Sequence, residues 1–368
     1  MTEVLTNRAL NRATLARQFL LDKADLTALE AVRHLYGLQA QAPTPPYFAL
    51  WARLRTFEPD DLSKLIVDKQ VVRIVLMRGT VHLVTADDAR ALRPLTQPLL
   101  NRDLLQNTIH APKLAGIDFD ELDRHTRAIL AERPRTNAEL GAALAEHYTD
   151  RDPGSLAYAA RDKVPLVQVP PRGIWGKSGQ PTYATAEHWL GEPLEQDSKP
   201  EEMVRRFLAA YGPASVLDVQ AWSGLTKLGE VVERIRKDLR TFRNEDGREL
   251  FDLPDAPRPD PDTPAPPNLL GGFEQLLLSY ADRTRVVSVE HLKEQVRTRA
   301  VARGTVLVDG RFAGVWDLAA KAKTATLTIE LWVQIEKSER DALLRRAGEL
   351  LRFAEPAADT HDVRVTTR

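Results

Sequence analysis

The sequence predicts an α+β protein that is mostly helical, with three tandem winged-helix units scaffolded by a small β subdomain. Two observations lead to this fold class. A helical run followed by a short β-rich hairpin recurs three times before residue 254, and a proline-rich segment then separates these repeats from alternating strands. The predicted parts are 1–115, 116–195, 196–253, a linker at 254–267, and a β subdomain with a C-terminal helix at 268–368.

The first unit begins with helices and ends in a hairpin. Apolar residues recur at helical spacing over 26–38, after Asp25 as the expected N-cap. Prolines from Pro43 onward end this helix, and a further helix is expected over 48–54. The hairpin is expected from the β-branched segment 71–76, a turn at Arg78–Gly79, and the alternating segment 80–84.

The second unit opens on a helix-start signal. Thr136 and Glu139 have the Thr-x-x-Glu spacing of a capping box, and the apolar run that follows predicts a helix. A second helical stretch follows it. Two strands are then expected on either side of the glycine-rich segment RGIWGKSGQP, at 164–169 and 182–185.

The third unit has the clearest helix-turn-helix pattern. Ser215 is the expected N-cap of the run VLDVQAWSG, Gly224 makes the turn, and a second helix follows over 226–239. The segments 240–245 and 248–253 meet at Asp246–Gly247, which predicts a further hairpin.

The C-terminal part is expected to be a small β subdomain. Residues 254–267 hold seven prolines in fourteen positions and predict an extended surface spacer. Strands are then expected at 306–308, 312–318 and 325–333, the first two joined at Asp309–Gly310. Ser338 is the expected N-cap of a last helix that ends near residue 353, and the polar tail beyond it is expected to be loose.

Composition excludes several kinds of site. The chain has no cysteine, which removes disulfides, thiolate zinc sites, cysteine-held clusters and a cysteine nucleophile. The eight histidines are scattered without metal-ligand spacing, so neither a metal nor another cofactor is expected. There is no apolar run of about 20 residues and no apolar signal core, so we expect a cytoplasmic protein with no membrane partner.

The charge is nearly balanced, with a formal net charge of −1 and a pI near 6.7. A nucleic-acid-binding protein of this charge must sort its basic residues onto one face. Between 291 and 311 only Glu294 and Asp309 oppose the basic residues Lys293, Arg297, Arg299, Arg303 and Arg311. This local bias indicates either such a face or a solvated amphipathic stretch.

Five stretches in order along the chain resemble the bacterial winged-helix DNA glycosylases of the AlkZ and YcaQ type. They are GLQAQAP (37–43), RGTVHLV (78–84), PPRGIWGKSG (170–179), GPASVLDVQAWSGL (212–225) and LLLSYADRTRVV (276–287). No single stretch is specific alone, but the ordered set spans most of the chain. The resemblance implies three tandem winged helices held by a β subdomain. The segment GGFEQ at 271–275 departs from the family, in which a proline and an Asp–Asn pair are expected.

The resemblance also implies the catalytic residues. The family signature is two polar residues around one apolar residue, and here it is Gln39-Ala40-Gln41, at the expected end of the second helix. This matches the Gln-Φ-Gln branch, which is associated with self-resistance to azinomycin-like crosslinking agents. A glutamine oxygen accepts a hydrogen bond from water but takes no proton at neutral pH, so Gln39 and Gln41 are expected to position water and stabilise the sugar cation. Without the resemblance, two such glutamines are ordinary solvated residues.

Other residues are candidates for DNA contact. Arg78, Thr80 and His82 alternate and are expected to share one face of the first wing, where packing alone is an equal alternative. In the glycine-rich loop, Trp175 stands between two basic residues, which suits phosphate contact and stacking, or else packing of the tryptophan under the loop. The full set of DNA-binding candidates is Arg78, Thr80, His82, Arg172, Trp175, Lys177, Arg303 and Arg311, the last at a hairpin tip that suits the minor groove.

The expected function is therefore that of a monofunctional DNA glycosylase, since no lysine stands at the Gln-Ala-Gln motif to form a Schiff base. Its expected substrate is double-stranded DNA with N7-alkylated purines, including natural-product interstrand crosslinks, and it is expected to act as a monomer. The alternative is a non-catalytic winged-helix regulator or damage sensor, because the fold does not fix the function.

Overall fold

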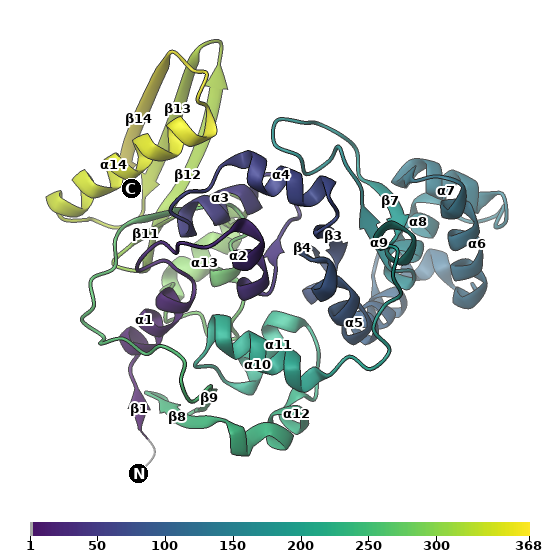
Figure 1. Cartoon of the computed structure of the whole chain (residues 1–368), viewed down its shortest axis with the longest axis horizontal. Coiled ribbons are helices and arrows are strands. Elements are labelled where there is room, and N and C mark those ends of the chain that lie inside the picture. Colours follow the sequence, from purple (N-terminus) through teal and green to yellow (C-terminus); the bar gives the residue numbers. More distant parts are fainter. Residues whose placement is uncertain (1–2) are drawn as a thin grey trace.

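Within residues 3–368, three β-sheets, of six, five and three strands, organise the fold (Figure 1). The computed structural model describes residues 3–368. Helices α6, α7 and α8 gather at the right of Figure 1, α10, α11 and α12 at the bottom, and the C-terminal sheet with α14 projects at the upper left. The α+β class expected from the sequence is confirmed, whereas the assignment of three winged helices and the boundaries between them stay predictions.

The six-stranded sheet joins the first two predicted units. Its strands run in the order β2-β4-β3-β6-β7-β5, and β3 of the first unit pairs antiparallel with β6 of the second. The strands are β2 (Leu38–Gln39), β3 (Val71–Val75), β4 (Val81–Thr85), β5 (Arg135–Thr136), β6 (Leu166–Gln168) and β7 (Thr182–Thr185). The two hairpins expected from the sequence are thus confirmed, and they lie in one sheet with β2 at its edge.

The first unit contains α1 (Asn7–Arg17), α2 (Ala28–Leu35), α3 (Pro45–Arg53), α4 (Pro59–Val67) and α5 (Ala86–Gln106). The expected N-cap Asp25 is wrong, because Thr27 caps α2 in a capping box with Glu30. The expected end of this helix is also wrong. Tyr36 is in the left-handed region and Gly37 has φ +103°, so the chain leaves the helix at Leu35 and enters β2.

The prolines after Gly37 have a different role from the one expected. They do not end α2; instead Pro45 and Pro46 stand in the first turn of α3, where a missing N–H costs nothing. The helix expected over 48–54 therefore begins three residues earlier.

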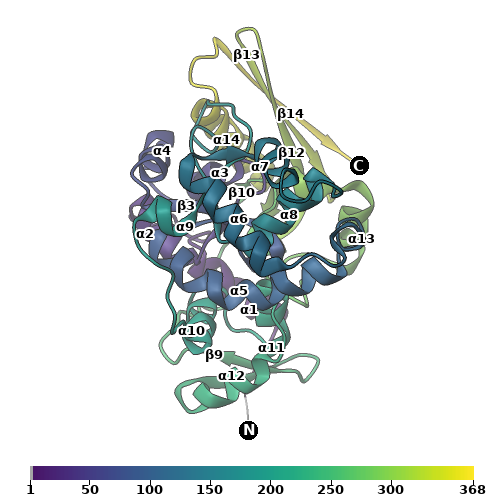
Figure 2. The same ribbon diagram turned by 90° about the vertical axis from the view of Figure 1, so that its right-hand side faces the viewer.

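The second unit consists of α6 (Phe119–Glu132), α7 (Asn137–Ala145), α8 (Pro153–Lys163) and the short α9 (Ala186–Leu190). The capping box at the start of α7 is confirmed: Thr136 Oγ1 accepts from the Glu139 N–H, and the Glu139 carboxylate accepts from the Thr136 N–H. A separate apolar cluster packs these helices together, with Leu122, Leu140 and Leu156 at its centre. In Figure 2 the molecule is turned so that α6, α7 and α8 face the viewer.

The third unit follows its sequence pattern closely. Ser215 caps α11 (Val216–Ser223), Gly224 ends it in the left-handed conformation, and α12 (Leu228–Ile235) follows. Helix α10 (Pro200–Tyr211) precedes them. The expected hairpin is confirmed as β8 (Arg240–Asn244) and β9 (Glu249–Asp252), and β1 (Val4–Leu5) adds to it in parallel.

The C-terminal subdomain is a five-stranded sheet covered by α14. It comprises β10 (Asn268–Leu270), β11 (Gly304–Val308), β12 (Arg311–Lys321), β13 (Thr324–Leu331) and β14 (Thr360–Thr367), with α13 (Val289–Thr298) and α14 (Lys337–Ala354). The expected cap of α14 is wrong by two residues, because Glu336 is the N-cap and Ser338 lies in the first turn.

The expected loose tail is also wrong. Residues 360–367 form β14, which pairs in parallel along all of β13. Val363 and Val365 alternate toward the apolar core of the subdomain, although most of the strand is polar. The polar sequence of this segment gave no sign that its backbone would pair with β13.

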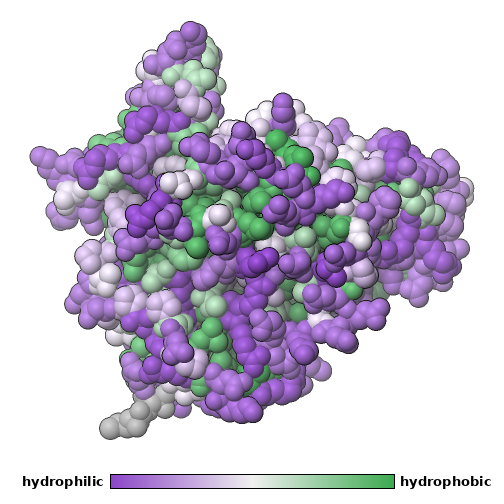
Figure 3. All heavy atoms as spheres, in the orientation of Figure 1, coloured by the Kyte–Doolittle hydropathy of each residue, from purple (hydrophilic) through white to green (hydrophobic). Residues whose placement is uncertain are grey.

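The proline-rich linker runs along the protein without regular structure and is held by α1. The buried Arg12 and Arg17 donate to the carbonyls of Thr263 and Pro257. Over residues 3–368, no helix is both long enough and apolar enough to span a bilayer. The face drawn in Figure 3 is mostly hydrophilic, with hydrophobic areas of small extent between charged ones.

Candidate active site

The Gln-Ala-Gln segment leaves the core at the edge of the six-stranded sheet. Gln39 pairs with His82 across β2 and β4, and the Ala40 N–H donates to the Val81 carbonyl at 2.8 Å. Ala40 is fully buried, Gln39 is 8% exposed, and Gln41 is exposed. Because successive residues of an extended chain alternate in direction, the two glutamines lie on the opposite side from Ala40. Ala40 therefore anchors the segment on one side, while Gln39 lies on the same side as its buried strand partner His82 and Gln41 is exposed.

Glycine is required where the chain turns into this segment. At Gly37 the φ of +103° is disfavoured for residues with a side chain, and an added Cβ would lie 2.7 Å from Val84 Cγ1. The close packing of Gly37 on β4 brings Gln39 beside the turn between β3 and β4.

Arg78 stands in that turn and holds Gln39. It lies in the short turn Met77–Gly79, where its own φ of +55° is left-handed, rather than in the strand. Its Nη2 donates to Gln39 Oε1 at 2.8 Å and to Gln275 Oε1 at 2.9 Å, while Nη1 donates to the Trp222 carbonyl at 2.7 Å. Burial lowers the pKa of Arg78 to about 10, so it is still a cation at neutral pH.

His82 supports Arg78 from within the protein. The ring is fully buried, with Nδ1 2.9 Å from the Thr80 carbonyl and Nε2 3.4 Å from Arg78 Nη2. A carbonyl only accepts, so Nδ1 carries the proton. Burial, and then the Arg78 charge, lower the pKa of His82 to about 3. His82 is therefore a neutral buried residue.

The structure thus separates the three residues expected on one face of the first wing. Arg78 and His82 meet, but Arg78 comes from the turn and His82 points into the core, so a shared DNA-facing surface is wrong for this pair. The left-handed turn at Arg78 is the physical reason. Thr80 is half-buried and its hydroxyl donates to the Met77 carbonyl at 3.2 Å.

Gln41 has a more open position than Gln39. Its side-chain Oε1 accepts from the Val81 N–H at 3.2 Å, which ties it to the start of β4. A neutral amide is a weaker donor than a guanidinium, and the Gln41 side chain is exposed. Its amide is therefore available to a ligand or to water.

The glycine-rich loop lies next to this segment. Arg73, fully buried on β3, donates to the Ala40 carbonyl at 2.8 Å and lies beneath Gly173, whose added Cβ would be 2.9 Å from Arg73 Cδ. Arg172 donates to the Gly179 carbonyl at 2.9 Å, and Lys177 is exposed. Trp175 packs on Tyr47 and Phe48 with ring centroids 4.8 and 5.9 Å apart.

A groove of about 570 Å³ follows the Gln-Ala-Gln segment. Its lining includes Ala42 and Thr44, just after Gln41, together with Trp175 and Arg303. Candidates far apart in the sequence thus meet in one depression. Arg303 is, however, already paired with Asp317 and Glu330.

The hairpin tip expected in the minor groove is turned inward. Asp309 pairs with Arg8 and Arg12 of α1, and the Gly310 carbonyl accepts from Asn11 Nδ2 at 2.8 Å. These contacts dock Asp309 and Gly310 on α1, and contact of this hairpin with the minor groove stays a prediction. Arg311 itself is exposed.

The sequence did not single out Gln275 for the site. It lies in the segment GGFEQ that departs from the resembled family, and it is 2% exposed. Its neighbour Glu274 forms a buried ion pair with Arg53 at 2.8 Å. The segment GGFEQ thus supplies a carboxylate that pairs with Arg53 and an amide that accepts from Arg78. The signal in the sequence was a pair of polar residues soon after two glycines.

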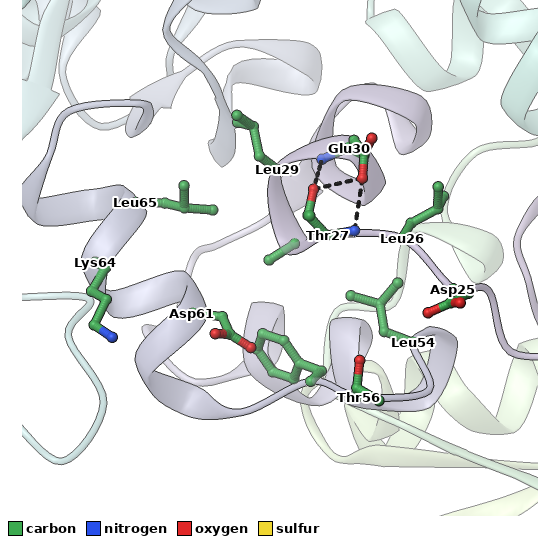
Figure 4. A pocket seen from close by; sticks show the side chains of 12 residues that line it. Asp25, Leu26, Thr27, Leu29, Glu30, Leu54, Thr56, Asp61, Lys64 and Leu65 are labelled. Atoms are coloured by element: carbon green, nitrogen blue, oxygen red, sulfur yellow. Dashed lines mark hydrogen bonds between the residues drawn. The ribbon is translucent and has the colours of Figure 1, made fainter.

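A second depression of about 510 Å³ lies between α2 and α4, and its chemistry does not fit a catalytic site. Figure 4 shows Thr27 and Glu30 hydrogen-bonded to each other in the capping box of α2, so these polar groups are already used. Asp61 and Lys64 lie on the opposite wall. Among residues 3–368 there is also no cluster of side chains suited to a metal ion.

Comparison with known proteins gives the family. A model of the DNA glycosylase AlkZ-like family matches residues 32–353. An interstrand DNA cross-link repair glycosylase of Streptomyces sahachiroi is 26% identical over 330 residues, which cover 84% of this chain and 87% of that protein. The structure of Streptomyces sahachiroi DNA glycosylase AlkZ has the same fold, with a TM-score of 0.80 and 22% identity over 99% of this chain and 100% of that one. Since the family model covers most of the chain, in agreement with the resemblance noted in the sequence, the protein belongs to the AlkZ-like DNA glycosylase family.

Proposed function

We propose that the protein is a monofunctional glycosylase that hydrolyses the N-glycosidic bond of N7-alkylated purines in double-stranded DNA, including purines joined in interstrand crosslinks. The observation that carries the proposal is the Gln39-Ala40-Gln41 segment, which is anchored by buried Ala40 and is followed directly by Ala42 and Thr44 in the lining of a groove. The name of the Streptomyces sahachiroi relative, an interstrand cross-link repair glycosylase, supports the crosslink as a substrate.

Hydrolysis of this N-glycosidic bond requires little more of the protein than correct placement of a water molecule. An N7-alkylated purine already carries a positive charge, so it leaves without a general acid. What the site must supply is an oriented water and a favourable setting for the separating charges. The amides of Gln39 and Gln41 are the proposed catalytic groups, with the oxygen of Gln41 placing the water.

The DNA-binding surface is proposed from the exposed and half-buried candidates around the site. Lys177 and Arg172 on the glycine-rich loop contact phosphates, Trp175 offers an edge of the groove, and Thr80 lies near the turn. Arg311 contacts phosphate from a separate place on the β subdomain. The three segments of helices followed by a hairpin act as winged helices in one monomer around the duplex.

Base release tests the proposal. The substrates are duplexes that carry one N7-methylguanine or one defined N7-guanine crosslink, and abasic sites are counted with wild type, Gln39→Ala and Gln41→Ala. We expect release by wild type and a loss of about tenfold or more in each variant, which corresponds to about 1.4 kcal/mol of barrier. Borohydride should trap no covalent enzyme–DNA product. Binding without release by wild type would instead make the protein a damage sensor.

A further inference from the structure

The oxygen of the Gln39 amide is already engaged by a charged donor. Arg78 donates to Oε1 at 2.8 Å, and since a guanidinium accepts no hydrogen bond, the orientation of the amide is fixed. Within residues 3–368 the Nε2 group of Gln39 has no hydrogen-bond partner, and it is not sealed from solvent. Gln39 therefore presents two N–H groups to a ligand rather than a free carbonyl.

Two residues that accept hydrogen bonds from Arg78 also have buried N–H groups of their own. Gln275 accepts from Arg78 through Oε1, which leaves its own buried Nε2 without a partner in the described part of the chain. The indole N–H of Trp222 is also buried without a partner there, while the Trp222 carbonyl accepts from Arg78. Within residues 3–368, Arg78 thus takes the amide oxygens of both glutamines as acceptors, and their Nε2 groups are left without a protein partner.

The charge at this corner is positive and uncompensated. Neither Arg78 nor Arg283 forms an ion pair with any described carboxylate, and the charge of Arg283 is close enough to lower the pKa of Arg78. His82 is neutral. A sugar cation is repelled by such a corner, whereas a group that gains electron density is stabilised by it.

We propose that Gln39, held by Arg78, which is itself held by Gln275, donates a hydrogen bond to an acceptor atom of the departing purine, and that Gln41 alone orients the water. This assignment rests on the proposed glycosylase function. The C1′–N9 bond breaks, its electron pair passes to N9 and neutralises the cationic purine, water attacks C1′, and the proton of that water goes to solvent. Arg78 and Gln275 are positioning residues, because they act through Gln39.

The substitution Gln39→Glu separates the two roles. A glutamate keeps an oxygen for Arg78 and has the same length, but its carboxylate has no N–H. We measure single-turnover release of N7-methylguanine from a duplex with saturating enzyme. If Gln39 is a donor, the rate falls about tenfold or more, to the level of Gln39→Leu, and does not rise between about pH 6 and 9. If Gln39 is an acceptor, the carboxylate acts as a base and the rate equals or exceeds that of wild type, which overturns the assignment.

Two comparisons separate this effect from folding and from DNA repulsion. Gln106→Glu adds the same charge at the exposed end of α5 and should leave the rate unchanged. Arg78→Lys, which retains a cationic donor, should keep more of the rate at saturation than Arg78→Met, with the Kd for the duplex within about twofold of wild type. A loss confined to Kd in Gln39→Glu would identify the acceptor as a backbone phosphate and overturn the assignment.

The remaining outcomes are also distinct. If Gln39→Glu does not fold, as judged by its melting transition, Gln275→Met removes one of the two amides held by Arg78. It should lower the rate at saturation several-fold, and an unchanged rate contradicts the assignment. Absence of release by wild type refutes the proposed function itself, whereas an active Gln39→Glu refutes only the role of Gln39.

Discussion

Arg73 and Arg78 hold the Gln-Ala-Gln segment from two sides. Arg73 donates to the backbone of Ala40, and Arg78 donates to the side chain of Gln39. Burial lowers the pKa of each to about 10, so both remain charged at neutral pH although neither has a carboxylate partner among the described residues. A buried cation (Arg73) and a half-buried one (Arg78), both satisfied mainly by neutral acceptors, are costly to the fold, which is expected where a site is organised for binding rather than for stability.

His82 makes a pH-dependent contribution to stability. Its folded pKa, about 3, lies below the ordinary value of 6.5, so the unfolded chain binds the extra proton first as the pH falls. The contribution is complete above about pH 6.5 and is lost as the pH falls toward the folded pKa. Within that window the slope approaches about 1.4 kcal/mol per pH unit for one proton.

The variant His82→Phe isolates this effect. We expect the difference in free energy of unfolding between wild type and His82→Phe, measured by urea denaturation, to favour wild type less at pH 5 than at pH 7.5. His125, half-buried on α6, provides the matched control in His125→Phe. A pH-independent difference at position 82 would show that the ring is accessible to protons in the folded state.

The buried ion pair Arg53–Glu274 connects α3 to the segment that carries Gln275. Both side chains are almost fully buried, and Arg53 also donates to Gln18. Removal of one partner leaves a buried charge unpaired, so Glu274→Leu should cost about 3–5 kcal/mol of unfolding free energy. Chemical denaturation measures this, with the exposed pair Arg297–Glu294 as control, where Glu294→Leu should cost about 1 kcal/mol or less. Equal losses would contradict the structural role given to Glu274.

At the scale of elements, local signals predicted structure well where they were strong. The capping box at Thr136, the N-cap Ser215, the turn at Gly224 and the β3–β4 turn were all visible in the sequence. Local signals failed where contacts between distant parts of the chain determine the structure. Strand β14 forms because β13 offers a free edge. The hairpin tip at Asp309 docks on α1 because that helix carries Arg8 and Arg12.

The capping box of α7 gives a prediction at this scale. Thr136 Oγ1 accepts from the Glu139 N–H, and the Thr136 N–H and hydroxyl donate to the Glu139 carboxylate. Thr136→Ala should therefore cost about 1 kcal/mol and Thr136→Ser much less. Thermal unfolding checks both variants. Because α7 packs in the separate cluster of the second unit, hydrogen exchange should show the loss in α6–α8 before the C-terminal sheet. A uniform loss over the chain would mean that the second unit does not open by itself.

At the scale of the whole molecule, the candidate site is assembled from three distant parts of the chain. Gln39 and Arg78 come from the first unit, Trp222 from the end of α11, and Gln275 from the segment after β10. The resemblance identified Gln39 and Gln41, and the sequence pattern brought Arg78 to attention. The sequence did not reveal that Arg78 binds Gln39, because that contact depends on how the units pack. The turn at Gly224 lies against Arg78, and a Cβ added at Gly224 would be only 3.1 Å from the Arg78 backbone.

Whether a basic residue is available to bind a DNA phosphate depends on whether a carboxylate already neutralises its charge. With a net charge of −1, binding depends on a few unpaired cations rather than on an overall positive charge. Lys177 is exposed and forms no ion pair within residues 3–368, whereas Arg303 is neutralised by Asp317 and Glu330.

Each phosphate contact releases counterions, so a plot of log K for DNA binding against log salt concentration should become shallower by about 0.9 for Lys177→Gln. For Arg297→Gln, whose charge already pairs with Glu294, the slope should stay that of wild type. Fluorescence anisotropy with an undamaged duplex over a range of salt concentrations measures both slopes. If Lys177→Gln leaves the slope unchanged, the glycine-rich loop lies off the DNA, and the groove beside Gln41 must be reached from another side.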